Sequence, residues 1–177
     1  MSNHLHIQSV SLSRRQRSRP DVVDGHREVS FNVSILVQNQ GDVALHVVNE
    51  LRTLDYDAAS TTLTLGLREP LPAPAQKYGP TLHLSTPRTE LIKPHASATL
   101  VVSIPAELKQ MKRNADFNLV MERTDLTLAR TIRCEVAASP QTLEARSQES
   151  VHALRTRLVQ WGHVARVETA VTLDAHG

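Results

Sequence analysis

Arginine is concentrated in one short segment near the N-terminus of this 177-residue chain. Arg14, Arg15, Arg17 and Arg19 lie in the connection between a first strand and a strand that begins at Val29. Each guanidinium offers a fork of N–H donors to a phosphate, and a loop needs no fixed fold to present such groups to nucleic acid. The segment therefore predicts either a phosphate-binding loop or a solvated loop whose charge is partly offset by the acidic residues that follow it: Asp21, Asp24 and Glu28.

The extreme N-terminus holds a second group of residues that could bind a ligand. If Met1 is removed, the terminal amine, two backbone amide nitrogens and the imidazole of His4 can form a square-planar nitrogen site suited to Cu(II) or Ni(II). His6 would lie on the same strand face as His4. A histidine at this position is also a common coincidence, so both interpretations stay open, and we expect no cofactor.

The usual local signatures of catalysis are missing from the sequence. The six glycines are too far apart for a P-loop, a dinucleotide-binding loop or a nucleophile elbow. The single cysteine, Cys134, excludes an intrachain disulfide and any zinc site built from two thiolates. Because Cys134 alternates with Ile132 and Val136, we expect it to be a small core residue. No catalytic residue is predicted, although an active site assembled from distant residues would leave no such signature.

An apolar stripe near the C-terminus could bind a protein. Its members are spaced three, four and three residues apart, as on one face of a helix: Val151, Leu154, Leu158 and Trp161. One interpretation is that the stripe packs on the same chain and covers part of a sheet. The alternative is that it docks on a partner subunit with Trp161 as the aromatic anchor.

The elements that carry these residues are mainly strands. Apolar residues alternate with polar ones from Val29 to Gln38, and the turn residues Asn39 to Asp42 follow, which indicates a half-buried strand and a hairpin. Further strands are predicted around Leu63 to Leu67 and at the ranges that follow: Thr81–Ser85, Ala98–Ile104, Phe117–Arg123 and Leu126–Val136. About seven to nine short strands without intervening helices favour an all-β, antiparallel sandwich over residues 1–138.

The pattern changes at Ser139. Ser139 is a good N-cap, Pro140 suits the first helical position and Gly162 suits the C-terminal cap. We therefore predict a helix of about 22 residues within 139–163, packed on or next to the sandwich. Alternation at Val167, Thr169, Val171 and Leu173 then predicts a short strand or tail in 164–177.

The segment from Val33 to Val48, with Asn39 and Gly41, is followed later by Pro87 to Pro94 leading into Ala98–Pro105. This order of extended segment, proline, strand and proline resembles bacterial immunoglobulin-like β-sandwich modules over residues 29–105. The likeness departs from true immunoglobulin domains, because the chain has no cysteine pair and its one tryptophan lies on the expected helix. The resemblance implies an immunoglobulin-like sandwich that binds other proteins.

The function expected from these features is a non-enzymatic protein-protein interaction or assembly module of a larger bacterial complex, with a protein partner or self-association. The alternative is a nucleic-acid or phosphate-binding accessory protein that uses Arg14 to Arg19, and a hydrolytic or metal-dependent enzyme ranks third. No apolar stretch approaches the roughly 18 residues of a membrane span. The first ten residues lack a basic region followed by an apolar block, so we expect no secretory signal and a cytoplasmic chain.

Overall fold

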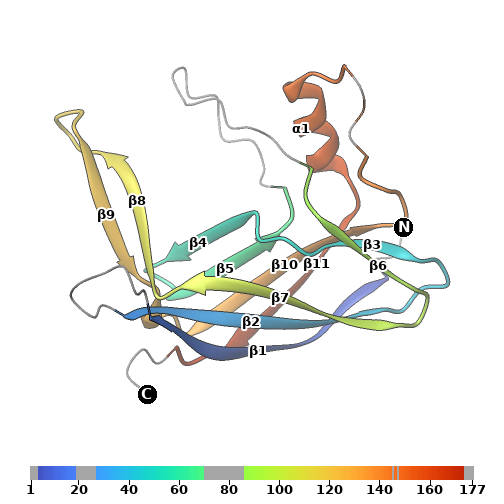
Figure 1. Ribbon diagram of the computed structural model, residues 1–177, viewed down its shortest axis with the longest axis horizontal. Helices are drawn as coiled ribbons and strands as arrows, with labels where there is room; N and C mark the ends of the chain where they lie inside the picture. The colour runs from blue at the N-terminus through green and yellow to red at the C-terminus, as the bar shows by residue number, and fades with distance from the viewer. Residues whose placement is uncertain (1–3, 19–26, 70–85, 145, 147, 174–177) are drawn as a thin grey trace.

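The computed structural model describes residues 4–18, 27–69, 86–144, 146 and 148–173. In these residues the chain is mostly β, with one α-helix near the C-terminus (Figure 1). Most strands form two sheets that face each other across a core of aliphatic side chains. The prediction of an all-β sandwich with one C-terminal helix is therefore confirmed. None of the described helices is long and apolar enough to cross a membrane.

The first sheet is three-stranded and antiparallel, in the order β1 (Leu5–Ser18), β2 (Arg27–Asn39) and β7 (Ser97–Pro105). Alternate residues of β2 and β7 point into the core, as the period of two predicts. The buried members are Phe31, Val33, Ile35, Val37, Leu100, Val102 and Ile104.

The second sheet has six strands, with β10 (Thr131–Ser139) at its centre. On one side β10 pairs with β11 (His163–Ala170), and on the other with β5 (Thr62–Leu67) and then β3 (Leu45–Val48). β4 (Thr53–Asp57) extends the sheet beyond β5, and β6 (Thr89–Ile92) extends it beyond β3. The β5–β10 pair is parallel, and the other strand pairs are antiparallel. β11 confirms a strand in the C-terminal tail.

The turn after β2 is an arch between the two sheets, so the predicted hairpin at Asn39 to Asp42 is wrong. β2 belongs to the first sheet and β3 to the second. Asn39 is fully buried at this crossing. Its Nδ2 atom donates to the carbonyl oxygens of Val43, Ile92 and Lys93 at 2.8, 3.2 and 3.2 Å.

The side-chain oxygen and the backbone N–H of Asn39 make further hydrogen bonds in the arch. Its Oδ1 accepts the backbone N–H of Gly41 at 3.0 Å, and its own backbone N–H donates to the carbonyl of Ala96. One side chain thus joins the end of β2 to the β6–β7 turn and to the start of the next sheet. Since carbonyl groups shielded from water need donors, this residue supplies hydrogen bonds at the crossing between the sheets.

The helix α1 spans Val151–Gln160, which is 10 residues, so the predicted start at Ser139 and the predicted length of about 22 residues are wrong. Ser139 is the buried last residue of β10, and its hydroxyl accepts the N–H of Gln141 in a turn. Strand pairing therefore overrides the local capping signal. The N-cap is Ser150, whose Oγ accepts the N–H of Ala153 at 3.1 Å. Gly162 follows the C-cap with φ 73°, which agrees with the predicted C-terminal cap.

The strands predicted at Phe117–Arg123 and Leu126–Val136 are present with shifted bounds, and they belong to different sheets. The first of these strands is β9 (Leu119–Asp125), and it pairs with β8 (Glu107–Arg113) in a separate two-stranded sheet. A 3₁₀ turn, η1 (Leu126–Leu128), then leads into β10, which starts only at Thr131. The predicted strand Thr81–Ser85 lies outside the described residues.

We expect Asn39→Ala to lower the free energy of unfolding by about 3 kcal/mol, because the side chain is fully buried and three carbonyl groups lose its hydrogen bonds. The midpoint of urea unfolding followed by circular dichroism measures the effect. The matched control is Asn32→Ala on the half-exposed face of the same strand, for which we expect a change within about 0.5 kcal/mol. Equal midpoints for the two variants would contradict this role of Asn39.

Candidate functional site: a projecting hairpin

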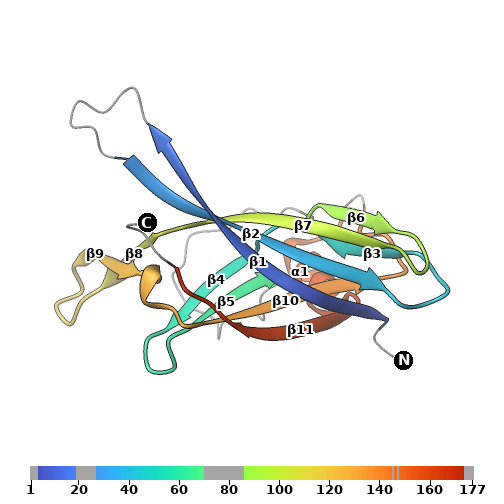
Figure 2. The same cartoon turned by 90° about the horizontal axis from the view of Figure 1, so that it is seen from below.

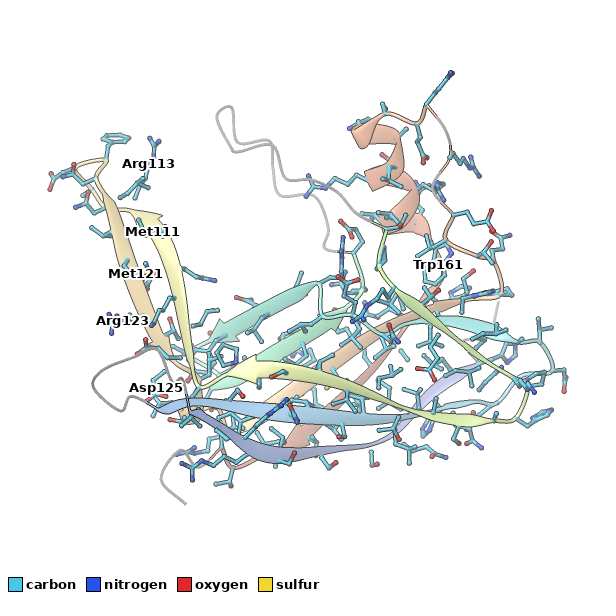
Figure 3. The ribbon with its side chains drawn as sticks, viewed as in Figure 1. Met111, Arg113, Met121, Arg123, Asp125 and Trp161 are labelled. Atoms are coloured by element: carbon cyan, nitrogen blue, oxygen red, sulfur yellow. The ribbon has the colours of Figure 1, made fainter. Side chains whose placement is uncertain are left out.

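The β8–β9 hairpin leaves the sandwich as a separate arm, which we define as residues 107–125 (Figure 1). Figure 3 shows its side chains running from Asp125 at the base to Arg113 near the tip, away from the sandwich. Two-stranded hairpins are at best marginally stable on their own in water, so the arm depends on its base or on a partner.

The base of the arm is anchored in the core. The backbone N–H of Ala106 donates to the carbonyl of Val29, and the N–H of Leu126 donates to the carbonyl of Ala106. Leu126 is fully buried, and Leu108 packs against the core. Asp125 accepts the N–H and the hydroxyl of Thr127 and so caps η1. These contacts set the direction in which the arm leaves the sandwich.

The tip of the arm is a three-residue loop closed by Asn114 and Asn118. The N–H of Asn114 donates to the carbonyl of Asn118, and the N–H of Phe117 donates to the carbonyl of Asn114, both at 3.0 Å. The loop has the form of a tight turn followed by a bulge residue in the left-handed region. That residue is Phe117, with φ 62°. Glycine or asparagine is the usual choice there, because a bulky side chain is strained.

Phe117 is also the most exposed of the large apolar side chains in the described residues, at 78%. Five of the nine such exposed side chains belong to the arm. Exposed apolar residues are ordinary when scattered, but a cluster on one small element marks an interaction surface. The arm's members are Met111, Phe117, Leu119, Val120 and Met121.

The register divides the arm into two faces. Met111 lies opposite Met121, between the pairs Lys109 with Arg123 and Arg113 with Leu119, and we call this side the methionine face. The opposite face carries Gln110, Lys112, Val120 and Glu122, with an ion pair between Lys112 and Glu122. Methionine is flexible and polarizable, which suits it to adaptable binding surfaces. The methionine face thus combines flexible apolar side chains with a rim of cations.

The arginine segment predicted as a loop is part of β1, so the loop prediction is wrong. β1 stays paired with β2 as far as Ser18 opposite Arg27, and Figure 2 shows the two strands continuing beyond the body of the sandwich. Arg14 is half-buried opposite Phe31, whereas Arg15 is exposed opposite Ser30. Neighbouring residues of a strand point to opposite faces, so these two guanidinium groups do not form one cradle. Arg17 lies opposite Glu28, and Arg19 is outside the described residues.

The histidines proposed as metal ligands lie at the start of β1. His4 and His6 are both exposed, and His6 lies opposite Gln38. Ser2 and Asn3, the other members of the predicted site, are outside the described residues. Within the described ranges, the side chains of His, Cys, Asp and Glu form no group of three or more that could hold a metal ion.

The helical stripe lies against the chain itself at its C-terminal end. Leu158 is buried, and Trp161 packs against the core and donates from Nε1 to the carbonyl of Gln141 at 3.1 Å. Leu154 is half-buried, and Val151 begins the helix. These contacts favour packing on the same chain, while docking of the stripe on a partner stays a prediction.

A surface pocket of about 640 Å³ lies between α1 and the segment before it. Arg157 lines this pocket and donates hydrogen bonds to both carboxylate oxygens of Glu149, at 2.9 and 2.7 Å. The hydrogen bonds from Arg157 lower the pKa of Glu149, and Glu149 in turn raises the pKa of Arg157. Both groups therefore stay charged near neutral pH, and neither is suited to proton transfer.

The buried ionisable groups of the second sheet are also committed to structure. Burial by itself raises the pKa of the Glu135 carboxyl, but the ion pairs with Arg68 and Arg166 outweigh it and hold the pKa below its usual value. Burial raises the pKa of the Cys134 thiol to about 12. A thiolate nucleophile is therefore absent at this position at neutral pH.

No protein-family model matches the chain, and neither a curated protein nor a solved structure is significantly similar to it.

The hairpin that forms the arm was missed by sequence reasoning. Its first strand, Glu107–Arg113, consists mostly of residues with good helix propensity and carries no β-branched residue. The available signal was the pair of turn formers, Asn114 and Asp116, just ahead of an apolar run.

We expect Cys134 in the folded chain to resist alkylation by iodoacetamide at pH 8, because it is buried and its pKa of about 12 leaves almost no thiolate. Mass spectrometry should show the unmodified protein under native conditions and complete modification in urea. Rapid modification of the native chain would show that the second sheet opens and would contradict the packing described for β10.

Proposed function

We propose that the chain is a non-enzymatic protein-protein interaction module of a larger complex, and that the β8–β9 arm is the part that contacts the partner. The observation that carries the proposal is Phe117, a fully projecting aromatic side chain at a backbone position that costs about 1–2 kcal/mol for a residue other than glycine. Strain of this kind is tolerated where the side chain serves a purpose outside the fold.

The composition of the arm supports the same function. Aromatic residues, methionine and arginine are enriched at protein interfaces, and the arm presents all three on a hairpin that is anchored at its base. The immunoglobulin-like resemblance over residues 29–105 and a cytoplasmic location belong to the proposal as well. Loops and hairpins held out by a β-sandwich are common recognition elements.

Phe117→Gly tests this proposal, because its expected effects on stability and binding have opposite signs. Removal of the strain should raise the free energy of unfolding by about 1 kcal/mol. Loss of the anchor should weaken partner binding by tenfold or more, which corresponds to at least about 1.4 kcal/mol. Urea unfolding measures the first effect. Photo-crosslinking in the cells that produce the protein, from a benzophenone amino acid at Val120, measures the second.

The matched control carries the benzophenone at Thr99, an exposed residue of β7 on the outer face of the sandwich. We expect a discrete crosslinked protein from position 120, a much weaker band in the Phe117→Gly background, and no such band from position 99. Crosslinks that are equal at both positions, or that do not change in Phe117→Gly, would refute the role of the arm.

A further inference from the structure

We propose that the free edge of β9 binds an extended segment of the partner as a third strand of the arm, and that this segment carries alternating apolar and acidic residues. The inference rests on the proposed function and adds to it the binding mode and the chemistry of the ligand. Peptides often bind in this way at exposed sheet edges, where main-chain hydrogen bonds give affinity and alternate side chains give specificity.

The backbone of the arm has N–H and C=O groups on the outer edge of β9 that could pair with an added strand. Asn114 and Asn118 form a hydrogen-bonded pair across the hairpin. Such pairs alternate with pairs whose N–H and C=O groups point outward. By this register, the residues whose N–H and C=O groups point outward are those of the methionine face. On β9 they are Leu119, Met121 and Arg123. In the described residues, nothing pairs with this edge, because the arm is a sheet of two strands.

The two edges of the arm differ in how they are protected. Lysine and arginine on an edge strand discourage the addition of another strand. β8 carries Lys109, Lys112 and Arg113 along its length, whereas the charged residues of β9 begin only at Glu122 and its tip half presents Leu119, Val120 and Met121 in succession. These three residues are 64%, 41% and 54% exposed. The tip half of β9 is thus the part of the arm's edges that is most open to pairing.

The charges of the methionine face define the partner. Lys109 and Arg123 share one carboxylate, Glu107, at the long distances of 3.8 and 3.9 Å. Arg113 has no ion pair among the described side chains, and Asp125 is engaged as the cap of η1. Three cations therefore face one weakly held acid, and an added strand with an acidic residue beside Arg123 would complement them.

A second copy of the chain does not supply this acid when the uncharged stretches of two β9 strands pair with each other. In a symmetric pairing of two β9 strands about Met121, each Arg123 would lie opposite Leu119 of the other copy, and Met121 would lie opposite itself. The expected ligand instead places apolar side chains beside Leu119 and Met121 and Asp or Glu beside Arg123, at every second position.

A substitution pair separates this mode from simple contact with the arm. Met121→Pro removes an outward N–H from the β9 edge and leaves the hairpin bonds intact, since proline is tolerated at such edge positions. Met111→Pro makes the same change on the opposite strand, so it is the matched control. Met121→Lys keeps the N–H and adds a protecting charge, which covers the case in which proline disturbs the hairpin.

The probe is a random ten-residue peptide library displayed on phage, selected on the full chain and counter-selected on Met121→Pro. We expect enriched peptides with alternating apolar and acidic residues that bind the parent chain and Met111→Pro. The same peptides should bind at least tenfold more weakly to Met121→Pro and Met121→Lys, and their binding should weaken with salt.

Failure to enrich any peptide, or peptides that bind Met121→Pro as well as the parent chain, would overturn the added strand. Phe117-dependent crosslinks from Val120 that persist in Met121→Pro would then leave the arm as the docking site and remove only the binding mode. A dimer abolished by Met121→Pro and retained in Met111→Pro would overturn the acidic ligand in favour of a second copy. Binding to phosphatidylserine vesicles without any peptide binding would overturn it in favour of a lipid surface.

Discussion

The side chain of Asn39 is the constraint on which the sandwich depends. Where β2 ends, the chain must cross from one sheet to the other, and the carbonyl groups of Val43, Ile92 and Lys93 meet at the crossing. One buried amide satisfies all of them and holds the β6–β7 turn in place. β7 starts at this turn and leads at its other end to the base of the arm.

The sandwich and the arm differ in how well their polar and apolar groups are buried and paired. In the sandwich, buried carboxylates are paired and the one thiol is protonated and enclosed. In the arm, apolar side chains are exposed, Phe117 is strained and the tip half of β9, Leu119 to Met121, carries no charged residue. An interaction module needs a stable body that presents an element with exposed apolar side chains and unpaired backbone groups. A partner can then make the contacts that the chain itself leaves open.

Sequence reasoning succeeded where burial alone decides structure and failed where long-range pairing does. The alternation of β2 follows directly from its burial on one face. The residues Asn39 to Asp42 suit a hairpin and an arch equally well, and the difference is the burial of Asn39, which appears only after both sheets assemble. Ser139 carries a valid capping signal that pairing of β10 overrides. The arm was missed because Glu107–Arg113 pairs outside the core and needs no apolar periodicity.

Hydrogen exchange of the backbone amides, measured by NMR on the isolated chain, tests the central claim most directly. The account predicts alternation along the arm: slow exchange at Gln110, Lys112, Val120 and Glu122, whose N–H groups pair across the hairpin, and fast exchange at Lys109, Met111, Leu119 and Met121, whose N–H groups face outward. Slow exchange at Leu119 and Met121 would show that the β9 edge is already covered. Fast exchange at every position would show that the arm does not form, and either result would contradict the account.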